Sequence, residues 1–90
     1  MSKAEAKVMV VNRDGMHARP VTQFSQLANQ FESKIEVSKG DLTVNAKSIM
    51  SMLRLAAEKG SILRIRADGK DAALAVKKLS ELVEHKFGME

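Results

Sequence analysis

The apolar residues of this 90-residue chain change their spacing several times, and this alternation restricts the possible folds more than any other feature. Clustered or alternating aliphatic residues are typical of strands, and apolar residues at steps of three and four are typical of helices. Turn-forming residues separate these segments. The pattern predicts the order βαββαβα, with strands at 7–11, 34–38, 42–45 and 61–67 and with helices that begin near 18, 49 and 72.

The ends of these elements are expected from local signals. Residues 1–6 are polar, and we expect them to be frayed. The apolar stripe of the first helix continues to Phe31. The second helix should end just before Gly60, because glycine readily takes the left-handed conformation that closes a helix. Asp71, at the start of the last helix, would suit the helix dipole.

Each predicted helix has one apolar face, and the strand at 61–67 places Leu63 and Ile65 on one side and Arg64 and Arg66 on the other. A sheet covered by helices on one face buries such elements. A chain of this length has no room for a second core. We therefore expect one α+β domain across residues 1–90, and the sequence assigns no role to Arg64 or Arg66.

The composition argues against several classes of function. The formal net charge is +4, but the basic residues are scattered, so no surface for a polyanion is indicated. An RNA-binding α/β domain would need aromatic residues on its exposed sheet face, and none of the three phenylalanines falls on a predicted strand. The apolar run at 8–11 is too short to span a membrane. We expect a cytoplasmic protein that neither inserts into membranes nor binds nucleic acid.

The segment 12–20 joins a predicted turn to a helix start and contains His17, Arg19 and the only proline of the chain. The first amides of the helix, at Ala18 and Arg19, together with the helix dipole and the guanidinium, form an anion site. Three roles are open to His17: a core or capping residue, a metal ligand, or a nucleophile that accepts a phosphoryl group. A metal is disfavoured, because the chain has no cysteine and its other histidine, His85, lies on the last helix.

The chain contains Gly15-Met16-His17-Ala18-Arg19-Pro20 and, further along, Asn45-Ala46-Lys47-Ser48-Ile49-Met50. At this spacing, both blocks resemble the signatures of the histidine-containing phosphocarrier protein family, HPr, of the bacterial phosphoenolpyruvate-dependent sugar phosphotransferase system. The resemblance covers nearly the whole chain. It implies an HPr-like open-faced sandwich, with three helices on one face of a four-stranded antiparallel sheet. It also implies a protein without a cofactor, and we expect a monomer.

The resemblance implies a carrier rather than a turnover enzyme. His17 would accept a phosphoryl group through Nδ1 from enzyme I and pass it to a histidine of a sugar-specific IIA component, while Arg19 would neutralise charge on the group in transit. A related carrier of the nitrogen branch shares the histidine motif, and the sequence does not separate the two branches. A purely regulatory paralogue is disfavoured, because such proteins lose the active histidine.

Ser48 and its neighbours have two interpretations each. Ser48 is a favoured N-cap, and it also matches the serine that HPr kinase/phosphorylase modifies in many relatives. Too many apolar residues follow it for all of them to face inward, so we expect Ile49 and Met50 to contact enzyme I and IIA. Leu53 either joins them or packs in the core. Met16 is expected to fill an apolar gap and is counted with the same partner contacts.

Overall fold

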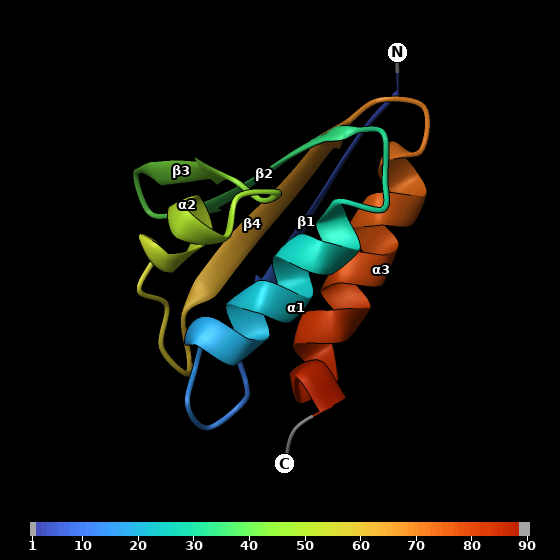
Figure 1. Cartoon of the computed structure of the whole chain (residues 1–90). Coiled ribbons are helices and arrows are strands. Elements are labelled where there is room, and N and C mark those ends of the chain that lie inside the picture. Colours follow the sequence, from blue (N-terminus) through green and yellow to red (C-terminus); the bar gives the residue numbers. More distant parts are fainter. Residues whose placement is uncertain (1, 89–90) are drawn as a thin grey trace.

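The computed structural model describes residues 2–88 and confirms the predicted order of elements. Figure 1 shows the strands and helices of this range and the short 3₁₀ helix that follows them. The elements are β1 (Lys3–Met9), α1 (Ala18–Ala28), β2 (Lys34–Lys39), β3 (Leu42–Asn45), α2 (Ile49–Leu53), β4 (Ile62–Asp68), α3 (Ala72–Glu84) and η1 (Lys86–Gly88).

The strands of the described chain form one antiparallel sheet of four strands, in the order β1-β4-β2-β3. β1 pairs with β4 in a register that sets Lys3 opposite Asp68, and β2 pairs with β4 in a register that sets Lys34 opposite the same residue. β2 and β3 form an antiparallel hairpin through the short turn at 40–41. The helices lie on one side of the sheet (Figure 1). The predicted open-faced α+β sandwich is therefore confirmed.

The covered face of the sheet packs against the apolar faces of the helices. Leu63 and Ile65 of β4 are fully buried, while Arg64 between them is exposed, as strand alternation requires. The helices bury small and aliphatic residues against this face, with one phenylalanine. These residues are Val21, Phe24, Ala28, Ala72, Ala75, Val76, Leu79 and Val83.

β1 begins earlier than its sequence predicts. The expectation that residues 1–6 are frayed is wrong from Lys3 onward, and for Met1 it lies outside the described residues. Ala4 and Ala6 pack, partly buried, against the core and lie opposite Ala67 and Ile65 of β4. Alanine gives a weak apolar signal, so tertiary pairing rather than local pattern sets the start of this strand.

α1 ends at Ala28, before the end of its apolar stripe. The side chain of the C-cap residue Asn29 donates to the carbonyl of Ser25 (2.8 Å) and to that of Lys47 (3.0 Å). It thereby takes up a carbonyl of the last helical turn and ties the helix end to the segment before α2. Phe31 still packs against the core from the following turn.

α2 also ends earlier than expected, at Leu53. Leu55 and Ala57 are buried but lie outside the helix, and Ala56 between them has a left-handed φ of 47°. The Lys39 ammonium donates to the carbonyls of Leu55 (3.2 Å) and Ala56 (3.3 Å). This contact from β2 stabilises a turn where the local pattern predicts more helix.

Asp71 connects the start of α3 to the loop before β2. It is the N-cap residue, but its side chain does not cap its own helix. Its carboxylate accepts hydrogen bonds from the amides of Glu32 (2.8 Å) and Ser33 (3.0 Å) and from the Ser33 hydroxyl. The Ser33 hydroxyl first, and then the Glu32 amide, stabilise the ionised form and hold the pKa of the Asp71 carboxyl below its ordinary value of 3.8.

We expect Asp71→Asn to lower the free energy of unfolding at neutral pH. We also expect the free energy of unfolding of this variant to fall less steeply than that of the wild type as the pH is lowered. Because the folded state lowers the pKa of Asp71, its contribution is fully present above the unfolded value and is lost as the pH falls through the folded value. Urea denaturation between about pH 2 and about pH 7 measures this difference.

Asp41→Asn is the matched control, because it removes an exposed carboxylate in the turn between β2 and β3. It should leave the acid side of the stability profile close to that of the wild type. If Asp71→Asn and the wild type lost stability in parallel as the pH fell, the three hydrogen bonds to Asp71 would not be coupled to its ionisation.

Candidate functional site

The candidate site begins with the loop between β1 and α1. Asn12 is 2% exposed, and its Nδ2 donates to the carbonyl of Gly15 (2.8 Å). The Gly15 amide donates back to the carbonyl of Asn12 (3.2 Å). These bonds close a tight turn in which Gly15 has a positive φ of 69°, a conformation that favours glycine. The turn predicted at the start of the segment 12–20 is confirmed.

The loop is fastened to the segment between α2 and β4. The Met16 amide donates to the carbonyl of Ala57 (2.8 Å). A Cβ on Gly15 would lie 2.7 Å from the Ala57 oxygen and 2.9 Å from Cα of Glu58, so only glycine fits this approach. Met16 is 3% exposed and fills an apolar gap, as predicted. Its expected role as a partner contact is wrong, because a buried side chain has no surface to offer.

His17 is the N-cap residue of α1. Its backbone is extended, with φ −85° and ψ −170°, and its carbonyl accepts the first helical hydrogen bond, from the Val21 amide (3.0 Å). The imidazole makes no capping hydrogen bond, and the residue is exposed. The structure thereby excludes the interpretation of the side chain as a core or capping group and leaves the ring available to a partner.

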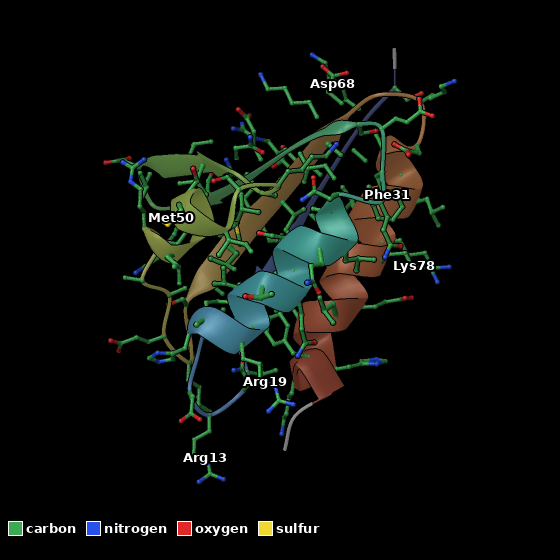
Figure 2. All side chains as sticks on the ribbon, in the orientation of Figure 1. Arg13, Arg19, Phe31, Met50, Asp68 and Lys78 are labelled. Atoms are coloured by element: carbon green, nitrogen blue, oxygen red, sulfur yellow. The ribbon has the colours of Figure 1, made fainter. Side chains whose placement is uncertain are left out.

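The first turn of α1 offers two backbone amides to an anion. Pro20 has no N–H, and the Val21 amide is bonded to His17. The N–H groups of Ala18 and Arg19 are therefore the ones without an intrahelical acceptor. Arg19 is exposed at the same end of the helix (Figure 2). The helix terminus and the guanidinium both favour negative charge next to the imidazole.

The part of the chain that the structure describes contains neither a cluster of metal-binding side chains nor a membrane-spanning helix. Within residues 2–88, no three His, Cys, Asp or Glu side chains gather in a group that could hold a metal ion. His85 is the C-cap residue of α3. No helix in this range is long and apolar enough to cross a bilayer.

The second part of the site is the α2 surface, which consists of Ile49, Met50 and Leu53. These side chains are 40%, 78% and 40% exposed, and Met50 is labelled on α2 in Figure 2. α2 contacts α1. The core position that Leu53 could have filled belongs to Met52, which is fully buried. An exposed apolar cluster of this kind is typical of surfaces that bind other proteins.

Ser48 caps α2. Its hydroxyl oxygen accepts a hydrogen bond from the Ser51 amide (3.1 Å), which confirms the predicted N-cap. The residue is only partly buried. It stands directly before the α2 surface, so a change of charge on Ser48 would act on that surface.

Sequence reasoning missed part of the scaffold of the site. Asn12 falls in the predicted turn, and nothing in its neighbours indicates that its side chain is buried. The contact of Gly15 with Ala57 and Glu58 joins segments about 40 residues apart, as their numbers show. The glycine before Met16 was the only local signal that two backbones approach closely here.

Comparisons with known proteins place the chain in a class of small phosphocarrier proteins. The family described as PTS HPr component, phosphorylation site, matches residues 4–85. Phosphocarrier protein HPr of Neisseria meningitidis serogroup A is 42% identical over 81 residues, which cover 90% of this chain and 91% of that protein. Phosphocarrier protein NPr of Shewanella violacea is 32% identical over 87 residues, which cover 97% of this chain and 96% of that protein.

Solved structures agree with this class. HPr-C-His from Thermoanaerobacter tengcongensis has a TM-score of 0.93 at 41% identity and covers 97% of this chain and 98% of that one. The HPr dimer from the same organism has a TM-score of 0.78 at 41% identity and covers 91% of this chain and 94% of that one. The chain therefore belongs to the HPr family of the phosphotransferase system.

Proposed function

We propose that this chain is a cytoplasmic, monomeric carrier that accepts a phosphoryl group on His17 from phospho-enzyme I and passes it to IIA components in sugar uptake. The observation that carries the proposal is the exposed imidazole of His17, the N-cap residue of α1, which makes no capping hydrogen bond to the helix. Membership of the HPr family supports it. The structure does not enclose His17, and this exposure suits a group that must be reached by a donor protein and then by an acceptor protein.

The chemistry that we propose needs little from the protein beyond position and charge. Nδ1 of His17 attacks phosphorus, a new P–N bond forms, and the P–N bond to the enzyme I imidazole breaks with its electron pair leaving on that imidazole. The amides of Ala18 and Arg19, which have no acceptor within the helix, would donate to the phosphoryl oxygens, and the Arg19 guanidinium adds a positive charge. Transfer to IIA repeats the step in the opposite sense, so the chain returns to its starting state.

We expect one acid-labile phosphoryl group on the wild type after incubation with phosphoenolpyruvate and enzyme I, and none on His17→Ala. Intact-mass spectrometry at neutral pH and after acid treatment measures both. His85→Ala is the matched control, because it removes the other histidine, at the end of α3, and should leave the modification in place. Phosphorylation of His17→Ala, or an unmodified wild type with an active enzyme I, would refute the proposal.

We propose in addition that enzyme I and IIA both bind the α2 surface. Its three side chains are apolar and exposed, and α2 contacts the helix that begins at His17. Methionine adapts its shape to more than one partner, which suits a carrier that must fit both a donor and an acceptor.

Met50→Asp should slow phosphoryl transfer from enzyme I and to IIA by about tenfold or more, because it places a charge in an apolar contact. Met50 is 78% exposed, so folding should not change. Quenched-flow transfer rates with each partner measure the effect. Leu74→Asp is the control, since Leu74 is 50% exposed on α3. Equal rates for Met50→Asp and the wild type with both partners would remove Met50 from the interface.

We further propose that Ser48 is a regulatory site for an HPr kinase/phosphorylase. Its partial exposure and its place before the α2 surface support this role, because a phosphate there would add negative charge beside an apolar contact. We expect incubation with the kinase and ATP to modify the wild type but not Ser48→Ala, as read by peptide mass spectrometry. An unmodified Ser48 in the presence of an active kinase would leave only its role as N-cap.

The second candidate function is that of the nitrogen-branch carrier, and the similarity to NPr of Shewanella violacea supports it. Both candidates use His17. The rate of phosphorylation by the enzyme I of each branch discriminates between them, and we propose the sugar branch because the HPr relative is the more similar of the two.

A further inference from the structure

The face of the sheet that no helix covers arranges its charged side chains in rows across the strands. In one row Arg66 of β4 lies opposite Glu5 of β1 and Glu36 of β2, and its Nη2 is 3.6 Å from the Glu36 carboxylate. In the next row toward the start of β1, Asp68 lies opposite Lys3 and Lys34. Opposite charges therefore face each other in both rows, which stabilises antiparallel pairs.

The third row breaks this rule. Lys7 of β1 lies directly opposite Arg64 of β4, and the next residues along the row are Ser38 of β2 and Thr43 of β3. No acidic residue belongs to this row. Two like charges directly opposite each other destabilise a sheet. Within residues 2–88, the Glu5 carboxylate of the neighbouring row, 3.0 Å from Arg64, offsets part of this repulsion. A ligand of opposite charge would offset the rest.

The polar side chains of this row can donate further hydrogen bonds to a ligand. The Nε of Arg64 is 3.0 Å from the Glu5 carboxylate in the neighbouring row, and the Arg64 side chain is 45% exposed, so its guanidinium can still donate to a ligand. Over the same range, Lys7 makes no ion pair within 4 Å. The hydroxyls of Ser38 and Thr43 are 2.9 Å apart, and since that contact uses one hydroxyl hydrogen, the other can be donated to a ligand.

These groups border a shallow depression of about 240 Å³, which is lined by Lys7, Ser38, Gly40, Ile62 and Arg64. Ile62 lies opposite Met9 in the row that follows, and each side chain is 49% exposed. The depression is thus lined by two cations, the Ser38 hydroxyl and the exposed apolar side chain of Ile62, and Met9 is the cross-strand neighbour of Ile62. The site is built on the open face, whereas His17 starts a helix on the covered face.

We propose that this depression binds a soluble, small-molecule phosphate monoester through Lys7 and Arg64, with the apolar part of the ester on Ile62 and Met9. A phosphate dianion matches two cations in charge, and its three terminal oxygens can accept from the guanidinium fork, the ammonium and a hydroxyl at once. The proposal gives Arg64 a role that Arg66 does not share, because both cross-strand neighbours of Arg66 are carboxylates, whereas those of Arg64 are Lys7 and Ser38. It does not depend on phosphoryl transfer at His17.

The test is a titration of the ¹⁵N-labelled chain with phenyl phosphate, followed by NMR, with sodium chloride at matched ionic strength as the reference. We expect saturable shifts of the amides of Lys7, Ser38 and Arg64. Lys7→Gln or Arg64→Gln should raise the dissociation constant obtained from these shifts by about tenfold, as expected for the loss of a hydrogen bond to a charged group. Arg66→Gln, which removes the same charge from the same strand and face, should change it by less than about twofold.

Two further variants examine the parts of the site separately. Ile62→Ser should reduce the affinity for phenyl phosphate to that for inorganic phosphate, because it removes the apolar step. Lys7→Glu should abolish binding and raise the midpoint of urea denaturation, because it places an opposite charge against Arg64. The second result distinguishes loss of the ligand from loss of the fold.

Three outcomes would overturn the proposal. One is equal shifts with sodium chloride and phenyl phosphate, which would indicate general screening of charge. Another is binding that Lys7→Gln and Arg64→Gln leave unchanged. The third is association with phosphatidic acid vesicles without any saturable response to soluble phosphate esters. Shifts confined to the amides of Ala18 and Arg19 would also contradict the proposal, because they would show binding at the start of α1 that the Lys7 and Arg64 variants leave unchanged.

Discussion

The pairing of β4 with both β1 and β2 is the constraint on which the rest of the structure depends. Side chains alternate along a strand, so this pairing turns Leu63 and Ile65 toward the helices and Arg64 and Arg66 toward the open face. A slip of one residue would exchange the two sets and place arginine in the core. The register of one central strand therefore determines both the buried core and the charged rows of the open face.

The candidate phosphoryl site depends on the same pairing. The end of β1 and the start of β4 are neighbours, and the loops that adjoin them are joined by the close approach of Gly15 to Ala57. That contact places the turn before His17, and the backbone of His17 then begins α1. In the proposed function, the imidazole of His17 needs no enclosed pocket, because the donor and acceptor proteins would supply the other half of the site.

The agreement between sequence and structure varies with the size of the side chains and the range of the contacts. β4 and the β2–β3 hairpin were predicted to within one residue, because large aliphatic residues alternate with polar ones. The predicted start of β1, at residue 7, lies after the observed start at Lys3, because Ala4 and Ala6 are too small to give a clear apolar signal. α2 was predicted too long, because Lys39 binds the carbonyls of Leu55 and Ala56 from a different strand.

The sequence by itself determined the order of the elements, the helix start at His17 and the cap at Ser48. These features depend on residues within a few positions of one another, so local periodicity and capping preferences are enough to reveal them. Only the tertiary structure decided that Asn12 is buried, that Leu53 is exposed and that Lys7 faces Arg64. Burial and cross-strand register depend on contacts between residues far apart in the chain, and local pattern carries no record of which distant residue will be the neighbour.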